Sequence, residues 1–179
     1  MKKLNRYTTL PVLLDMLNRK SLVLLDPVTW EDKNDTEIIA EYKKRKKLRA
    51  LFALCGSQGD ETIHHWKTFA DGISGCCVEF DLDKLIPTFK KLDGVRFGPV
   101  KYRKLRELKD GMIAVDDMPF TKRWPYRCEE EYRIIWQSSK LASSFEIAFD
   151  LRAISQITIS QRMPDQIYRA IRDSLTRTM

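Results

Sequence analysis

The sequence contains no long hydrophobic run. Its apolar stretches all fall short of the roughly 18 consecutive residues that a membrane-spanning helix needs. The first residues, MKKLNRYTTLPVLL, also lack the continuous apolar core and the small-residue cleavage site of a signal peptide. We therefore expect a protein without a membrane segment, located in the cytoplasm.

Metal-binding and phosphate-binding motifs are also missing. The two histidines, His64 and His65, are adjacent, and on a helix they would point in different directions. The four cysteines include no CxxC pair, so we expect packed, reduced thiols and no metal site. There is no GxxxxGKS/T or GxGxxG phosphate loop and no GxSxG nucleophile elbow. A Ser-His-Asp or Cys-His site built on other spacings stays open.

Positive charge is in excess, with 32 Lys and Arg against 25 Asp and Glu and a net charge of +7. Much of this excess lies in two runs, EYKKRKKLRAL and VKYRKLRELK. The first run, from Lys43 to Arg49, has two interpretations. It is either a solvated helix face or a surface that binds the phosphates of a nucleic acid. Neither run is interleaved with the aromatic residues on which single-stranded bases stack.

The length and the hydrophobic pattern predict one α+β domain over residues 1–179. We expect small split sheets around a cleft, with flanking helices. Strands are predicted over residues 4–8, 21–26, 51–55, 75–81, 95–102, 130–137, 145–150 and 154–160. Helices are predicted over residues 10–19, from the end of the polar loop VTWEDKND to about Arg49, across HHWKTFADG with an end at Gly72 or Gly75, over 82–91 and over 163–177.

The stretch YRCEEEYRII places three carboxylates at the start of a predicted buried strand. Because side chains alternate along a strand, Glu129, Glu131 and Arg133 are expected to share one face, with Glu130 on the other. One interpretation is a charge ladder at a sheet edge, in which Arg133 neutralises Glu131. The other is a pair of acids that face a solvent-accessible cleft. The apolar continuation IIW favours a strand that enters the core.

Four segments together resemble a bacterial family of unknown function, domain-of-unknown-function family twenty-nine-seventy-one. They occur in the family's order over nearly the full length of the chain. They are RYTTLPVLLDMLNRKSLVLLDPVTWED, FALC followed by HWKTFADGISGCCVEFD, CEEEYRII, and ISQITISQRMPDQIYRAI. The chain departs from the family pattern at Cys128, Phe69 and Ser160 and in the loop EDKND, which affects the local shape of a pocket.

The layout of that family is similar to compact ADP-ribosyltransferases, including those that modify DNA in toxin systems. The similarity implies NAD as a substrate, with Arg6 binding it from the first strand. Stacking of the nicotinamide is then assigned to Tyr7, Trp66 or Phe69. Glu131 would stabilise the positive charge that develops on the ribose, and Glu129 would act as a general base. A toxin or phage-defence protein further implies an antitoxin or defence-system protein as partner.

Three classes of function remain open on the sequence. The first is an NAD-dependent ADP-ribosyltransferase that acts on nucleic acid or on a nucleic-acid-associated target. The second is a noncatalytic module that binds nucleic acid or protein, which the positive net charge favours equally. The third is a nuclease in which the adjacent glutamates hold a divalent metal. In the first class, Glu129 and Glu131 are predicted to share a cleft with Arg6.

Overall fold

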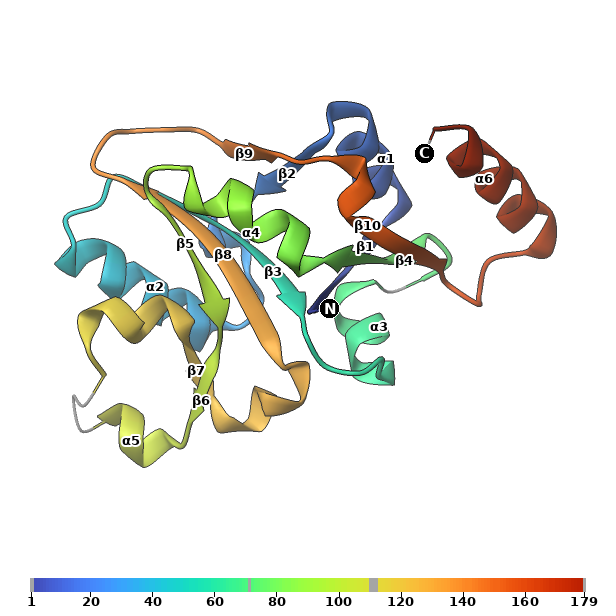
Figure 1. The fold of residues 1–179 in the computed structure, drawn as a ribbon. Coiled ribbons are helices and arrows are strands. Elements are labelled where there is room, and N and C mark those ends of the chain that lie inside the picture. The colour runs from blue at the N-terminus through green and yellow to red at the C-terminus, as the bar shows by residue number, and fades with distance from the viewer. Residues whose placement is uncertain (1, 71, 110–112, 179) are drawn as a thin grey trace. The chain divides into compact units, whose positions relative to one another are not determined.

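The computed structural model describes residues 2–70, 72–109 and 113–178 (Figure 1). The chain divides into two compact units. The first contains the residues up to Leu22, Gly56–Thr88 and the residues from Ala148 on, and the second contains Val23–Cys55 and Phe89–Ile147. The pairing of strands is mainly antiparallel. The predicted α+β class is confirmed, whereas a single domain with a cleft between two sheets stays a prediction.

The first unit is built on three antiparallel strands in the order β10-β4-β1. Strand β1 pairs with β4 along its whole length, with Tyr7 opposite Cys77. The elements of this unit are β1 (Lys3–Thr9), α1 (Leu10–Arg19), α3 (Ile63–Phe69), β4 (Gly75–Asp81), a 3-10 turn at Leu151–Ala153, β10 (Ile154–Ile159) and α6 (Asp165–Thr178).

Helix α1 has the predicted limits. It begins directly after β1 with Pro11 in its first turn, where the missing N–H costs no hydrogen bond. Leu13 and Leu17, one turn apart, are buried on the face toward the core. The helix ends at Arg19, and the next residue, Lys20, takes the left-handed conformation (φ 52°) usual directly after a helix C-terminus.

The second unit contains strands in the order β3-β8-β5, and β8 therefore lies between two neighbours. Strands β6 and β7 form a separate parallel pair. The elements are a 3-10 turn at Pro27–Thr29, α2 (Lys33–Arg45), most of β3 (Ala50–Ser57), β5 (Val95–Pro99), β6 (Lys101–Arg103), α5 (Leu105–Lys109), η2 (Val115–Phe120), β7 (Thr121–Arg123), η3 (Trp124–Glu129) and β8 (Glu131–Ser138). Strands β2 (Ser21–Leu24) and β9 (Phe145–Ala148), which pair with each other, and helix α4 (Leu82–Lys90) cross the division along the chain.

The core of the second unit forms around β8 and α2. Ile134 and Ile135 of β8 are completely buried, and Ile135 packs with Phe120. Tyr42 of α2 is buried beside Leu51 of β3. Such apolar burial is the main favourable term in folding. It also surrounds the polar side chains of β8 with a medium in which unpaired charge is costly.

The predicted extent of helix α2 was wrong at its C-terminus. The helix ends at Arg45, and Lys47 takes the left-handed conformation (φ 54°). The N–H of Leu48 then donates to the carbonyl of Lys43 at 2.9 Å, a bond typical of a closed helix end. Lys46 to Arg49 therefore lie outside the helix.

Among the described residues, no helix is long and apolar enough to cross a membrane.

Candidate functional site

Five charged side chains form a buried cluster in the second unit, here called the acid–base cluster. Three carboxylates face two cations, which leaves one negative charge in excess. The members come from α2, β7, η3 and β8, and they are Asp35, Lys122, Glu129, Glu131 and Arg133. Burying so many charges is costly unless each is paired and hydrogen-bonded, so their contacts decide what the cluster can do.

Arg133 is the centre of the cluster and is 0% exposed. Its Nε and one terminal nitrogen donate to the two oxygens of Glu131 at 2.5 and 3.0 Å. Both terminal nitrogens also donate to the carboxylate of Asp35, and one donates to the carbonyl of Pro119 at 3.0 Å. The guanidinium lies over the ring of Trp30, 4.8 Å from its centroid. Two carboxylates and an aromatic face thus fix the guanidinium plane.

Lys122 connects the second acid to the cluster. Its Nζ donates to Glu129 Oε2 at 2.6 Å and to Glu131 Oε2 at 3.3 Å. Asp35 Oδ2 lies 3.8 Å from the same nitrogen. The ring centroid of Tyr126 is 4.8 Å away. The two predicted catalytic acids therefore meet, and they meet on one ammonium group.

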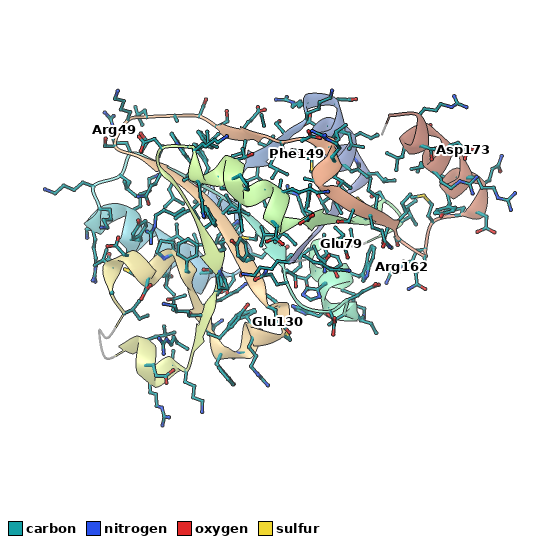
Figure 2. The ribbon with its side chains drawn as sticks, viewed as in Figure 1. Arg49, Glu79, Glu130, Phe149, Arg162 and Asp173 are labelled. Atoms are coloured by element: carbon teal, nitrogen blue, oxygen red, sulfur yellow. The ribbon has the colours of Figure 1, made fainter. Side chains whose placement is uncertain are left out.

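The backbone brings Glu129 and Glu131 together by a different route from the one predicted. Glu129 is the last residue of η3, and β8 starts only at Glu131. Glu130 lies between them in the left-handed conformation (φ 40°) and is exposed (Figure 2). Strand alternation was therefore the wrong reason for the shared side, although Glu130 does point away from the other two. The N–H of Glu131 donates to the hydroxyl oxygen of Tyr102 at 2.8 Å.

The prediction that the two acids face a solvent-accessible cleft is wrong. Glu129 is 4% exposed and Glu131 is 6% exposed. A pocket of about 290 Å³ does open in this unit, but neither acid lines it. Its walls include Glu37, Ile38 and Arg123. The charge-ladder interpretation is correct in pairing Arg133 with Glu131, but it is wrong in placing them at a sheet edge, since β8 lies between β3 and β5.

Opposing electrostatic effects set the ionisation of the acids. Burial raises the pKa of Glu131, but the neighbouring Arg133 and Lys122 outweigh burial and lower this pKa to about 2. For Asp35, burial raises the pKa, the bonds with Arg133 oppose the rise, and the negative charge of Glu131 adds to it. Burial, with a smaller contribution from the charge of Glu131, thus raises the pKa of Asp35, while Glu131 stays ionised at neutral pH.

The lowered pKa of Glu131 predicts a loss of stability in acid. Its ordinary value is 4.5 and its folded value is about 2, so its contribution is complete above pH 4.5 and disappears as the pH falls toward 2. At about 1.4 kcal/mol per pKa unit, this contribution is at most about 3 kcal/mol. Asp35, with a raised pKa, acts in the opposite direction. Urea unfolding of the wild type and of Glu131→Gln should therefore show a stability gap that narrows as the pH falls, and a gap independent of pH would contradict this.

The predicted nicotinamide-stacking residues lie in the first unit. Tyr7 of β1 stacks on His65 of α3, with ring centroids 4.9 Å apart and planes at 9°. Trp66 meets Tyr7 edge-on at 5.5 Å and donates from its ring nitrogen to Glu61 at 2.7 Å. Phe69 is 44% exposed, and its ring is 6.5 Å from that of His65. Tyr7 and Trp66 are therefore in contact, and Phe69 adjoins them through His65.

Arg6 lies on the opposite side of β1 from this aromatic group. Arg6 and Tyr7 are consecutive in the strand, and they pair with Val78 and Cys77 of β4. Consecutive side chains of a strand point to opposite faces. Arg6 and Tyr7 therefore cannot both contact the same small ring, such as a nicotinamide, on one face of the sheet. The prediction that Arg6 shares a cleft with Glu131 joins the two units and stays a prediction.

Several residues of these sites were missed by sequence reasoning. Arg133 was expected to pair with Glu131, but Asp35 was missed: it bonds to Arg133, 98 positions away in the chain, and no local pattern signals such a pair. Lys122 was also missed, because it stands beside Arg123 in PFTKRWP and no local signal there distinguishes a buried lysine from an exposed one. His65 was considered for metal binding and for a catalytic site with Ser or Cys, and it is a buried ring whose Nδ1 lies 2.9 Å from Thr62 Oγ1.

The basic run of residues 43–49 is partly neutralised. Arg45 pairs with Glu41 at 2.7 Å, and Lys46 pairs with Asp116 at 2.7 Å. Lys44, Lys47 and Arg49 are exposed and form no ion pair with a described carboxylate (Figure 2 labels Arg49). The lysines of the last helical turn also interact favourably with the partial negative charge at the C-terminal end of the helix dipole. Both interpretations of this run therefore remain open.

Within residues 2–70, 72–109 and 113–178, no group of three or more His, Cys, Asp or Glu side chains is arranged to hold a metal ion. In the acid–base cluster, Lys122 and Arg133 occupy the space between the carboxylates. The geometry therefore gives the nuclease alternative no support.

No protein-family model, curated protein or solved structure matches the chain.

Proposed function

We propose that the chain is an NAD-dependent, ADP-ribosyltransferase-like protein of bacterial toxin or phage-defence type, acting on nucleic acid or a nucleic-acid-associated target. Its membership of domain-of-unknown-function family twenty-nine-seventy-one is part of the same proposal. The observation that carries it is the convergence of Glu129 and Glu131 on Lys122 Nζ, at 2.6 and 3.3 Å. A fixed carboxylate beside a positive charge, with a second acid in reach as a general base, is the kind of arrangement that would favour cleavage of NAD.

The chemistry connects this arrangement to the reaction. When the bond between nicotinamide and ribose breaks, positive charge develops on the ribose, and a fixed carboxylate stabilises that charge. Glu131 remains ionised at neutral pH, as this role demands. Glu129 would accept the proton of the attacking group. In this proposal the ammonium of Lys122 marks the position of a stabilised positive charge, and it must leave that position when NAD reacts.

Residues of the first unit would bind NAD. Tyr7 and Trp66 already contact each other and offer aromatic surface to the nicotinamide, with Phe69 beside them. Arg6, on the other face of β1, would contact the diphosphate, for which a guanidinium is well suited. Because β1 lies inside a sheet, the aromatic group and Arg6 face opposite sides of it, and they are alternative anchors for NAD in this proposal.

A noncatalytic binding module is the second candidate, and one observation favours it. Both oxygens of Glu131 are occupied by Arg133 and Lys122, and the carboxylate is buried. In this alternative the cluster serves only to fix α2, β7 and β8 in place. In that case the chain would bind nucleic acid or protein through its surface.

Calorimetry with NAD separates these candidates. The proposal expects NAD binding with a dissociation constant below about 1 mM, equivalent to about −4 kcal/mol. Tyr7→Ala should weaken binding about tenfold or more, since loss of a base-stacking ring typically costs about 1–3 kcal/mol. Tyr168→Ala, which removes an exposed ring of α6, is the matched control and should bind NAD normally. Absence of binding at millimolar NAD would leave only the binding module.

A further inference from the structure

An exposed tryptophan lies among cations on the surface of the second unit. Trp124, the first residue of η3, is 43% exposed. The guanidinium carbon of Arg127 is 5.0 Å from its ring centroid, and the ammonium of Lys104 is 5.9 Å from it. The run around Lys104 contains one aromatic residue, Tyr102, whose hydroxyl accepts a hydrogen bond from the N–H of Glu131, so an exposed ring beside Lys104 must come from elsewhere in the chain. The fold supplies one from a segment 20 positions farther along.

The register of the parallel pair β6–β7 explains this meeting. Arg103 of β6 is paired with Arg123 of β7. The chain leaves both strands in the same direction, so the next residues, Lys104 and Trp124, come out side by side. Arg127, one turn later in η3, reaches back over the same ring. Backbone pairing therefore fixes the position of the ring and of one cation.

Lys104 and Arg127 contact this ring, Arg103 and Arg106 lie within two positions of Lys104 in the sequence, and this group of cations is largely unneutralised. Arg103, Lys104, Arg106 and Arg127 are all exposed, and none forms an ion pair with a described carboxylate. Nearby, the backbone N–H of Lys104 donates to Glu107 at 2.7 Å, Lys101 pairs with Asp117 at 3.3 Å, and Arg123 pairs with Asp32 at 3.7 Å. We call Arg103, Lys104, Arg106, Trp124 and Arg127 the tryptophan surface.

We infer that the tryptophan surface binds single-stranded nucleic acid, with a base stacked on Trp124 and phosphates bound by the surrounding cations. Exposed aromatic rings beside a positive surface are the combination that single-strand binding proteins use. Base stacking on such a ring is stronger than an exposed cation–π contact, so a base can displace Lys104 or Arg127 toward the phosphates. A duplex keeps its bases stacked inside and cannot use the ring.

The inference does not rest on NAD chemistry, since binding is measurable without NAD. It does bear on the acceptor. Trp124 and Glu129 are the first and last residues of η3, so a strand bound at the ring lies close to the acid–base cluster. Single-stranded nucleic acid would then be the acceptor class in the proposed reaction. Loss of oligonucleotide binding and loss of NAD binding are separate results.

Fluorescence anisotropy with labelled single strands of about 20 nucleotides, in DNA and RNA form, tests this surface, with a duplex of equal length for comparison. We expect the single strands to bind more tightly than the duplex. Trp124→Leu should weaken single-strand binding about tenfold or more, while Trp124→Phe keeps a stacking ring and most of the affinity. Affinity is also measured between about 50 and 200 mM salt. In the double variant Lys104→Glu and Arg127→Glu, the slope of log affinity against log salt concentration should be shallower, by the amount expected for the loss of about two phosphate contacts.

Matched controls separate this surface from general charge effects. Tyr168→Ala removes a comparably exposed ring from the other unit and should not change affinity. Lys44→Glu with Lys47→Glu makes the same charge change in the basic run and should weaken binding less than the change at Lys104 and Arg127. Circular dichroism and melting temperature confirm folding of every variant. The inference would be overturned if duplex and single strand bind equally well and Trp124→Leu binds as tightly as the wild type. It would also be overturned if the wild type binds no single strand at about 50 mM salt.

Discussion

Replacing Arg133 with Met is expected to lower the free energy of unfolding by about 3–5 kcal/mol. Met fills much of the same volume, but it leaves Asp35 and Glu131 buried without their common partner. The cluster would then hold three carboxylates and one cation. Removing one partner of a buried ion pair typically costs this much, because an uncompensated charge remains. The expected loss is a large share of the free energy of unfolding of a typical domain, which is about 5–15 kcal/mol. Urea unfolding measures it.

Two further variants identify the cause of that loss. Arg45→Met removes an exposed partner of Glu41 and should change stability by less than about 1 kcal/mol, as exposed pairs do. Combining Arg133→Met with Asp35→Asn and Glu131→Gln removes the unpaired charges and should recover part of the lost stability. This combination also keeps the test decisive where the single variant does not fold. A cost below about 1 kcal/mol for Arg133→Met would show that the cluster is not a unit.

The elements of the fold were largely predictable because their signals are local. Helix α1 has apolar residues at helical spacing behind Pro11, and its predicted limits match the structure. The apolar runs of β3, β4 and β8 are dense enough to indicate buried strands. The end of α2 was missed because Lys47 takes a left-handed conformation in which glycine is the usual residue. A lysine there gives no signal in a sequence.

The candidate sites were only partly predictable, because their geometry depends on long-range pairing. Glu129 and Glu131 were identified from a local run, yet their alignment follows from the left-handed Glu130 rather than from strand alternation. Their partner Lys122 lies on another strand, and no spacing rule connects it to them. Lys104 and Trp124 meet only through the register of β6 and β7. Such contacts become visible once the strands are paired.

Glu131→Gln is expected to lower NAD turnover about 100- to 1,000-fold if the proposed function is correct. Gln keeps the shape of the side chain but removes the charge that stabilises the developing cation, and losing one such contact typically has this effect. Glu130→Gln is the matched control. Glu130 is exposed, adjacent in sequence and outside the acid–base cluster, so turnover should hardly change. The rate of NAD turnover is measured by quantifying the released nicotinamide with chromatography.

Stability measured on the same two proteins separates catalysis from structure. Glu131→Gln leaves two carboxylates with two cations, so the excess negative charge disappears while Arg133 keeps its bonds to Asp35. We therefore expect it to cost at most about 3 kcal/mol, less than Arg133→Met, which increases the imbalance. A catalytic Glu131 predicts a folded protein that has lost turnover. A purely structural Glu131 predicts a less stable protein whose turnover per folded molecule is unchanged, and that result would refute the catalytic assignment.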